Sequence, residues 1–297
     1  MTNTILQCLP TASEAPRRLA ARLAIPLSPI ELHRFPDEEL RVTVGPAAPT
    51  TIVYGSLHEP DHKLLALLFA SEALRRGGAK RLVLAAPYLC YMRQDAAFRE
   101  GEAISQKVIG KLLAEAFERV VTVNTHLHRT SNIADVFPKI EADNLSAMPA
   151  VAATLRGTLD PYTIVTGPDA ESQPWVSDLA ARLQLDYAVL QKRRRGDRTV
   201  EITFADPSIF ANRSVLLVDD IVSSGGTLAA CAKALSAAGA RTIDAIAIHA
   251  LFAPDLAATL FKAGVRSVKS TDSVPHPTNA VALDGVLANA LRKECGT

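Results

Sequence analysis

Two adjacent acidic residues precede a loop of small residues in the C-terminal half of the chain. Asp219 and Asp220 follow the apolar run Val215–Val218. The loop that comes next reads Ser223-Ser224-Gly225-Gly226-Thr227 and leads into a helical pattern. Glycines let backbone N–H groups approach a phosphate, hydroxyls add donors, and the start of a helix favours negative charge. Because carboxylates accept hydrogen bonds from vicinal hydroxyls, the combination predicts a sugar-phosphate site. The alternative is a capped turn whose acids are solvated.

Arg93 and Gln94 have side chains that suit a nucleotide. They lie beyond the apolar run Arg81–Ala85, and open α/β sheets bind ligands beyond the ends of their strands. A guanidinium group offers a planar fork to phosphate oxygens, and a glutamine amide can satisfy the edge of a purine. Taken alone, such a pair is more often part of a solvated loop.

Near the N-terminus, Phe35, Asp37 and Glu39 stand in the segment Phe-Pro-Asp-Glu-Glu. An aromatic ring can stack on a base, and the two carboxylates can accept hydrogen bonds from an exocyclic amine or from ribose. Without other evidence, this pattern is more typical of a surface turn.

Three further residues have the chemistry of metal ligands. His126 follows the apolar run Arg119–Val123, and His128 would point to the same side if that strand continued. Asp169 follows Tyr162–Val165 and offers a hard oxygen ligand that suits Mg²⁺. On their own, three scattered residues are weak evidence for a metal site.

Four consecutive cations occupy Lys192–Arg195. A charge run is most often a solvated loop. The functional interpretation is a loop that closes over a polyphosphate and neutralises charge that grows during transfer.

Strand and helix patterns alternate along the chain, which predicts βαβ units and mainly parallel sheets covered by helices on both faces. The predicted strands are Thr51–Tyr54, Arg81–Ala85, Arg119–Val123, Tyr162–Val165, Tyr187–Leu190, Val215–Val218, Ile243–Ala247 and Arg266–Lys269. The predicted helices are Asp61–Arg76, Ser105–Phe117, Leu145–Leu155, Ser172–Leu183, Thr227–Ala238, Asp255–Ala263 and Ala280–Lys293. Gly77-Gly78 should end the first helix, and Asp61 should cap it. Val200–Phe204 has the two-residue period of an antiparallel strand added near a sheet edge.

Length and composition limit the class of protein. With 297 residues, 48% of them hydrophobic, the chain fits two globular domains, and a boundary is expected around Asp143–Pro149. Its 32 basic and 31 acidic residues nearly cancel, so nothing global favours nucleic acid or an acidic membrane as a partner. The four cysteines form no CxxC pair, which argues against a zinc ribbon or a disulfide framework. With no secretory pattern and no long apolar stretch, a cytoplasmic location is expected.

The segment Arg213–Ala240 resembles the phosphoribosyl pyrophosphate binding motif, which phosphoribosyltransferases and ribose-phosphate pyrophosphokinases share. Further segments look like those of the pyrophosphokinases and keep their order along nearly the whole chain. These segments are Phe35–Glu39, Pro87–Asp95, Gly101–Ser105, Asn124–His126, Gly167–Asp169, Lys192–Arg194 and Thr271–Pro275. The chain as a whole therefore resembles the ribose-phosphate pyrophosphokinase family.

The resemblance implies an α/β fold of two phosphoribosyltransferase-type domains, each a mainly parallel sheet flanked by helices. Residues 1–145 would bind ATP, residues 146–297 would bind ribose 5-phosphate, and the active site would lie at their junction. The last helix is compatible with packing on either domain. The implied reaction transfers the diphosphoryl group of Mg-ATP to the anomeric hydroxyl of ribose 5-phosphate, giving 5-phosphoribosyl 1-diphosphate and AMP. A homo-oligomer, a dimer or higher, is also implied, because the Phe35 loop of the family reaches a nucleotide bound mainly by a neighbouring subunit.

The same resemblance assigns roles to the residues introduced above. ATP would be held by Phe35, Asp37, Glu39, Arg93 and Gln94. The 5-phosphate would be held by Ser223, Ser224, Gly225, Gly226 and Thr227, and the ribose hydroxyls by Asp219 and Asp220. His126 and Asp169 would serve the Mg²⁺ site, and the catalytic group would consist of Lys192, Arg194 and His126.

The sequence departs from the family's pattern at two positions. Asn124 stands where the family usually has Asp, which keeps a carbonyl oxygen and loses a charge. Glu38 replaces a glycine between the acids of the N-terminal loop, which removes conformational freedom. A weakly active or regulatory, non-catalytic paralogue is therefore an alternative. A phosphoribosyltransferase is a third candidate, although it gives no reason for the ATP-like first half.

Overall fold

The chain divides into two compact units. The computed structural model describes residues 3–195, 199–253 and 255–296, apart from the side chains of residues 192–195 and 199–201. The first unit comprises Met1–Leu145 and Leu283–Thr297, and the second comprises Ser146–Ala282. Each unit contains one six-stranded sheet whose paired strands are all parallel, so the predicted α/β class with mainly parallel sheets is confirmed.

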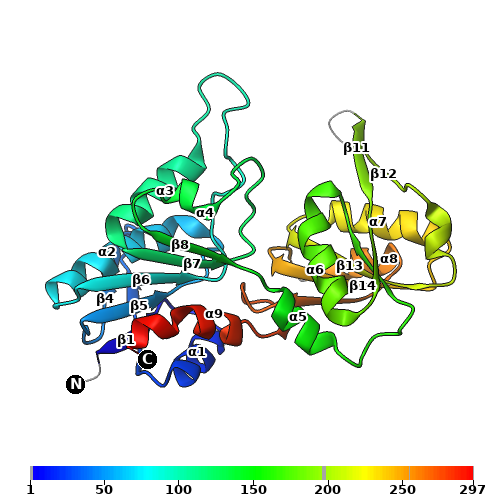
Figure 1. Ribbon diagram of the computed structural model, residues 1–297. Coiled ribbons are helices and arrows are strands. Elements are labelled where there is room, and N and C mark those ends of the chain that lie inside the picture. Colours follow the sequence, from blue (N-terminus) through cyan, green and yellow to red (C-terminus); the bar gives the residue numbers. More distant parts are fainter. Residues whose placement is uncertain (1–2, 196–198, 254, 297) are drawn as a thin grey trace. The chain divides into compact units, whose positions relative to one another are not determined.

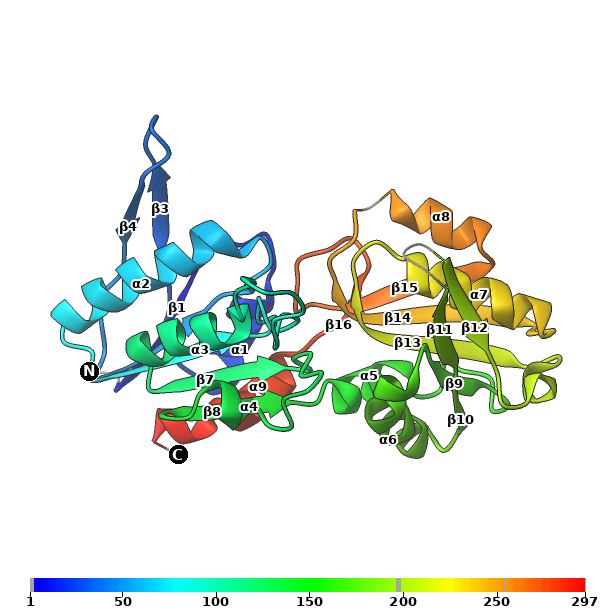
Figure 2. The ribbon, with the colours of Figure 1, turned by 90° about the horizontal axis from the view of Figure 1, so that it is seen from above.

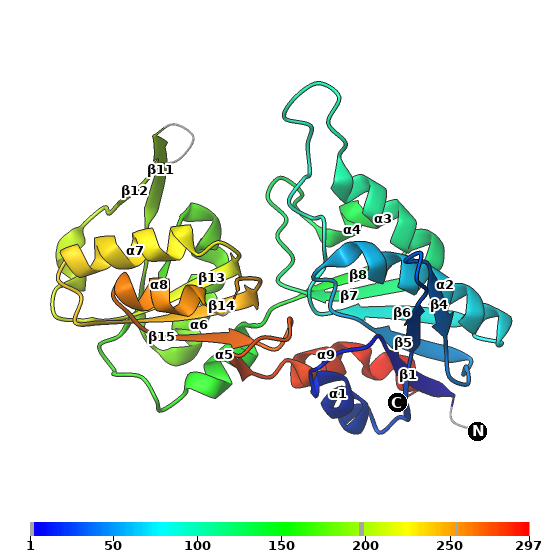
Figure 3. The same ribbon diagram turned by 180° about the vertical axis from the view of Figure 1, so that it is seen from behind.

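The sheet of the first unit has the strand order β2-β1-β5-β6-β7-β8 (Figure 1). Its strands are β1 (Thr4–Cys8), β2 (Leu27–Pro29), β5 (Thr50–Tyr54), β6 (Arg81–Ala86), β7 (Arg119–Val123) and β8 (Glu141–Leu145). The helices are α1 (Ala15–Leu23), α2 (Pro60–Arg76), α3 (Ser105–Ala116), α4 (Ile133–Val136) and α9 (Asp284–Leu291), followed by a 3₁₀ turn at Arg292–Cys295. Figures 1 and 3 show α2 and α3 on one face of the sheet and α1 and α9 on the other. A separate antiparallel hairpin, β3 (Glu31–Arg34) and β4 (Leu40–Thr43), projects from this unit in Figure 2.

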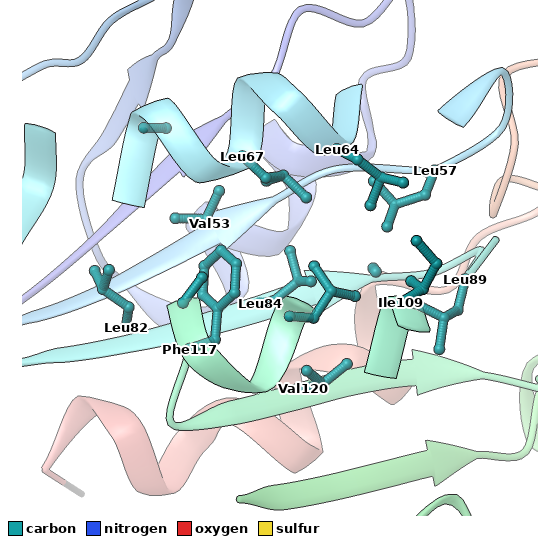
Figure 4. Packing of buried hydrophobic residues seen from close by; sticks show 14 of the residues in the cluster. Val53, Leu57, Leu64, Leu67, Leu82, Leu84, Leu89, Ile109, Phe117 and Val120 are labelled. Atoms are coloured by element: carbon teal, nitrogen blue, oxygen red, sulfur yellow. The ribbon is translucent and has the colours of Figure 1, made fainter. Parts of the chain in front are cut away.

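The core of the first unit explains why β5, β6 and β7 could be predicted as strands from the sequence. Leucines of α2 and the residues Ile109 and Phe117 pack on Val53, Leu84 and Val120 of the sheet (Figure 4). Every residue of β7 is buried, as expected for a strand whose two faces are both covered by helices.

The sheet of the second unit has the order β10-β9-β13-β14-β15-β16. Its strands are β9 (Ile164–Gly167), β10 (Asp186–Val189), β13 (Ser214–Val222), β14 (Thr242–Ala250), β15 (Val265–Thr271) and β16 (Asn279–Val281). The helices are α5 (Met148–Leu155), α6 (Gln173–Leu183), α7 (Gly226–Ala237) and α8 (Leu256–Lys262), with 3₁₀ turns at Ala170–Ser172 and Pro207–Phe210. In Figure 2, α7 and α8 cover one face of the sheet and α5 and α6 the other.

Several predicted elements need correction. Val200–Phe204 does form an antiparallel strand, β12 (Thr199–Thr203), but it pairs with β11 (Gln191–Arg195) in a separate hairpin, not at a sheet edge. The helix expected from Leu145 begins at Met148, because residues 141–145 form β8. Helix α2 begins at Pro60 without a side-chain cap, so Asp61 lies in its first turn instead of capping it. The helix does end at Gly77, as expected, with Gly78 in the left-handed region (φ 102°).

The C-terminal residues are held on the first unit by buried charges. Asp284, at the start of α9, forms ion pairs with Arg18 and Arg22 of α1. Glu294 forms ion pairs with Arg119 at 2.8 Å and with Arg81 at 2.7 Å, and the side chains of Glu294 and Arg119 are only 4% and 2% exposed. The contacts of Asp284 join α9 to α1, and those of Glu294 join the 3₁₀ turn after α9 to the strands β6 and β7.

Candidate functional site

The glycine loop of the second unit, residues 223–227, presents backbone N–H groups that are hydrogen-bond donors. It follows β13 and ends at the first turn of α7. Gly225 is buried and has φ 67°, and a Cβ atom on it would lie 2.4 Å from Cδ2 of Leu256. Gly226 is exposed, its φ is not positive, and a Cβ atom there would meet only Ser224 Oγ at 3.7 Å. Gly225 is therefore required by the backbone, whereas the side-chain space of Gly226 is open.

The donors of this loop are available to a ligand. Among the described residues, the amides of residues 223–226 donate no hydrogen bond to the protein, as expected at a helix N-terminus. Ser223 and Ser224 are exposed. The predicted combination of free N–H groups, hydroxyls and the positive end of a helix is thus present and fits an anion such as phosphate.

Asp219 and Asp220 lie inside β13, not after it as the sequence pattern predicted. The strand runs on to Val222, with Asp219 opposite Ala247 of β14. Both acids are 9% exposed, and Asp220 accepts a hydrogen bond from the N–H of Ile221 at 2.8 Å. Because successive side chains of a strand point to opposite faces, the two carboxylates do not have equivalent positions beside the loop.

Asp169 follows β9 at the same edge of the second sheet as the glycine loop. It caps a 3₁₀ turn by accepting a hydrogen bond from the N–H of Glu171 at 3.2 Å. The turn packs closely on the strand end, because a Cβ atom on Gly167 would lie 1.8 Å from Ser172 Oγ. The carboxylate of Asp169 is thereby oriented at a strand end.

The segment Thr271–Pro275 forms hydrogen bonds to the end of β14, at the same edge of the sheet. Thr271 Oγ1 and Ser273 Oγ donate hydrogen bonds to the carbonyl of Ile248 at 2.6 and 2.9 Å, and Ser273 Oγ lies 2.8 Å from Nδ1 of His249. Thr271 and Ser273 are fully buried, so these side chains hold the end of β14 in place.

In the first unit, the loop after β6 carries Arg93 and Gln94. Arg93 is exposed and Gln94 is half-buried. The amide of Gln94 donates to the carbonyl of Ala96 at 3.1 Å and to the carboxylate of Glu102 at 3.2 Å. The same carboxylate accepts from the N–H groups of Phe98 and Arg99, so Glu102 gives this loop a defined shape.

The loop after β7 carries the residues predicted to serve a metal site. The strand ends at Val123, and Asn124 takes up the left-handed conformation (φ 41°), so the strand does not continue to His126 and His128. The two rings are nevertheless neighbours, stacked with their centroids 6.1 Å apart. Asn144 of β8 fixes the loop by accepting from the N–H of Thr125 at 2.8 Å, a contact that nothing in the sequence pattern indicated.

Two residues of the loop after β5, and one in the first turns of the helix α2 that follows it, were also missed by sequence reasoning. Ser56 Oγ lies 3.1 Å from Nδ1 of His58, and Lys63 Nζ donates to the carbonyl of His58. Burial, followed by the nearby Lys63 charge, lowers the pKa of His58 to about 4. Burial also lowers the pKa of Lys63. This loop lies beyond the same, carboxyl ends of the strands as the loops that carry Arg93 and His126, since β5, β6 and β7 are parallel neighbours.

Phe35, Asp37 and Glu39 lie at the tip of the β3–β4 hairpin. The ring of Phe35 is 38% exposed, packs edge-on against His33 and has the guanidinium of Arg41 at 5.8 Å from its centroid. Glu38 at the tip has φ 72°, a conformation that favours glycine. The acids and the ring are therefore presented together on a short projecting hairpin.

Lys192 and Arg194 belong to β11, and the backbone pairs them with Ile202 and Val200 of β12. Their side chains lie outside the described part of the structure, so their predicted catalytic role remains a prediction.

Comparison with known proteins matches both units. Residues 6–116 match the family described as the N-terminal domain of ribose phosphate pyrophosphokinase, and residues 149–279 match the phosphoribosyl transferase domain. The ribose-phosphate pyrophosphokinase 2 of Archaeoglobus fulgidus is 34% identical over 284 residues, which cover 96% of this chain and 98% of that protein. The ribose-phosphate pyrophosphokinase of Methanopyrus kandleri is 32% identical, covering 94% of this chain and 96% of its own length.

A solved structure has the same fold. The crystal structure of phosphoribosylpyrophosphate synthetase from Mycobacterium smegmatis superposes with a TM-score of 0.82 at 24% identity, covering 98% of each chain. Together with the two family matches, this shows that both units have the phosphoribosyltransferase type of domain. None of the described helices combines the length and apolar character needed to cross a membrane.

Proposed function

This chain belongs to the ribose-phosphate pyrophosphokinase family of enzymes, and on that premise we propose that it makes 5-phosphoribosyl 1-diphosphate and AMP from Mg-ATP and ribose 5-phosphate. The anomeric hydroxyl attacks the β-phosphorus, a new O–P bond forms, and the bond from that phosphorus to the oxygen of the α-phosphate breaks. The protein contributes positioning and charge stabilisation.

In the proposed complex, ribose 5-phosphate occupies the end of β13. The amides and hydroxyls of residues 223–227 hold its phosphate, and the carboxylates of Asp219 and Asp220 accept hydrogen bonds from its ring hydroxyls. The observation that carries this proposal is the combination of two buried acids with a loop whose amides 223–226 have no protein acceptor among the described residues. A buried carboxylate gains most from a hydroxyl partner, because little water competes for it.

ATP is proposed to bind the first unit through Arg93 and Gln94. The exposed guanidinium of Arg93 suits phosphate oxygens, and the amide of Gln94 exchanges its present acceptors for the base. Phe35, Asp37 and Glu39 are proposed to contact the nucleotide of a neighbouring subunit, as their position on a projecting hairpin allows. This part of the proposal requires a homo-oligomer, which sedimentation or light scattering measures directly.

Mg²⁺ is the proposed cofactor, with His126 and Asp169 as its protein partners. Asp169 fits the ion, because its carboxylate is oriented by the N–H of Glu171 and, within the described residues, its second oxygen accepts no hydrogen bond. An imidazole is a softer ligand, so the fit rests on the carboxylate. The ion would supply positive charge to the triphosphate of ATP. Lys192 and Arg194 are proposed to add charge to the transferring group.

The experiment is an assay of AMP formation by the purified chain with ribose 5-phosphate, ATP and Mg²⁺. Ribose-phosphate-dependent AMP release that is lost in Lys192→Ala supports the proposal, with Lys233→Ala, a lysine on α7, as the matched control. No AMP release by the native chain would refute it.

A second candidate function is favoured by one residue. Asn124 lacks the charge that the family's usual Asp would bring, although asparagine is well suited to its left-handed backbone (φ 41°). Activity gained in Asn124→Asp, a change that this backbone conformation also accommodates, would indicate a paralogue disabled at its metal site. A regulatory partner would form no AMP either as the native chain or as Asn124→Asp.

A further inference from the structure

Two loops that carry proposed site residues follow adjacent strands of the first unit. Strands β6 and β7 are parallel neighbours, paired from Val83 with Arg119 to Ala86 with Thr122. The loop after β6 carries Arg93 and Gln94, and the loop after β7 carries His126. Neither loop belongs to a helix or strand at these residues, so side chains must fix one loop relative to the other.

The first link is the pair Asp95 and Arg129. Asp95 accepts from the backbone N–H of Arg129 at 2.9 Å and from its Nη1 at 2.8 Å. The carboxylate side chain is only 1% exposed, whereas that of Arg129 is 50% exposed. Burial raises the pKa of Asp95, but the hydrogen bonds and charge of Arg129 outweigh burial and hold that pKa below its ordinary value. The guanidinium carbon of Arg129 also lies 5.0 Å from the ring centroid of Phe98, further along the first loop.

The second link is Gln106 in the first turn of α3. Its side chain is 4% exposed, and its Nε2 donates to the carbonyl of Met92 at 3.2 Å. Its backbone N–H donates to the carbonyl of Gln94 at 3.2 Å. Its Oε1 accepts from Thr130 Oγ1, in the second loop, at 2.9 Å. One buried amide therefore contacts both loops.

The two links lie on either side of Arg93 and Gln94 along the chain. We propose that Arg129 and Gln106 are positioning residues, which hold residues 92–95 against residues 129–130 so that the backbone carrying Arg93 and Gln94 keeps one position beside the nucleotide. This inference rests on the proposed function of that site. A segment that is already ordered loses less conformational freedom when its ligand binds, so the links favour nucleotide affinity without contacting the nucleotide.

The kinetic test compares Arg129→Ala and Gln106→Leu with the native enzyme, with Arg182→Ala as the matched control. Arg182 also pairs with a carboxylate, that of Asp178, but does so on helix α6 of the second unit. We expect the KM for Mg-ATP to rise by about tenfold in each positioning variant, since misplacing a site by about 1 Å costs up to about 100-fold. The KM for ribose 5-phosphate should stay within about twofold.

Rescue separates positioning from simple loss of stability. Asp95 takes one side-chain hydrogen bond from Arg129, so Arg129→Lys can restore the ion pair, without the planar contact with Phe98, and should recover part of the affinity for Mg-ATP. An unchanged KM for Mg-ATP in Arg129→Ala would overturn the proposal. Equal rises in both KM values, together with no rescue by lysine, would also overturn it, because a general structural defect would then explain the effect.

Hydrogen exchange tests the same links on the free protein. The amides of Phe98 and Arg99 donate to Glu102 within the first loop, and they should exchange at least about tenfold faster in Arg129→Ala than in Arg182→Ala. Unchanged exchange at these amides would overturn the positioning role. An enzyme that forms no AMP would refute the proposed function instead, and the exchange rates would still decide whether Arg129 orders this loop.

Discussion

The two glycines of the loop between β13 and α7 should respond to alanine in opposite ways. At Gly225 the backbone is left-handed (φ 67°), which costs an alanine about 1–2 kcal/mol. Its Cβ would also lie 2.4 Å from Leu256, and overpacking of that kind costs about 1–3 kcal/mol. Gly225→Ala should therefore destabilise the second unit by about 2–5 kcal/mol.

Gly226→Ala should leave the fold intact and damage binding. Its Cβ would meet only Ser224 Oγ at 3.7 Å, and replacing a helical glycine by alanine is neutral or stabilising by up to about 1 kcal/mol. The new methyl group would occupy the space in which the phosphate is proposed to approach the amides. Loss of one hydrogen bond to a charged group, about 1.5–3 kcal/mol, raises the KM for ribose 5-phosphate about 10- to 100-fold.

Urea unfolding and steady-state kinetics on both variants measure these effects. The reasoning fails if Gly226→Ala binds ribose 5-phosphate normally, because the loop would then not contact the phosphate. It also fails if Gly225→Ala is as stable as the native chain, because the close contact with Leu256 would then be wrong.

Three further changes test other parts of the structure. Glu38→Gly should stabilise the hairpin tip by up to about 1 kcal/mol, because φ is 72° there, and a lower urea midpoint would contradict this. His58 has a folded pKa of about 4, below its unfolded value near 6.5, so only the unfolded chain gains this proton as pH falls between these values. The native chain should accordingly lose more stability than His58→Gln between about pH 6.5 and 4, and parallel pH profiles would refute the assignment. Glu294→Gln should cost about 3 kcal/mol, because Arg119 stays buried with a weaker partner, and an unchanged unfolding free energy would show that Asp143 suffices.

Buried apolar runs made several central strands recognisable in the sequence, although the buried strand β1 was not predicted and the exposed edge strand β10 was. β7 was predicted with its bounds because all five residues are buried, and the apolar core of β13 was recognised for the same reason. The strand β8 was not predicted, because it is an edge strand whose sequence, Glu-Ala-Asp-Asn-Leu, is mostly polar. The polar side chains of this strand have partners elsewhere in the fold, such as Arg119 for Asp143, and no local pattern records such pairs.

The sequence indicates a site most directly where the chemistry is local, and least where it depends on other elements. The glycine loop has its donors in consecutive residues, so its open amides followed from the sequence. The Asp95–Arg129 link joins residues 34 positions apart, and the contact of Gln106 with Thr130 joins residues 24 apart. Each of these residues alone is typical of a solvated loop, so only the three-dimensional structure distinguishes a link from a surface charge.

The loops after β5, β6 and β7 each contain one residue whose backbone conformation is unfavourable. Each contains a non-glycine residue in the left-handed region: Glu59 (φ 49°), Tyr91 (φ 61°) and Asn124 (φ 41°). This conformation costs Glu59 and Tyr91 about 1–2 kcal/mol each, and Asn124 less, so it persists only if the surroundings hold it. Tyr91 is held by a hydrogen bond to Asp61 in the first turn of α2, and Asn124 by its N–H bond to the carbonyl of Leu145 at 2.9 Å. Asn124 directly follows β7 and redirects the chain within one residue, whereas Glu59 and Tyr91 lie five residues beyond the ends of β5 and β6. Among the described residues, three of the seven non-glycine residues with positive φ lie in these loops, and the packed helices and strands around them supply the compensation.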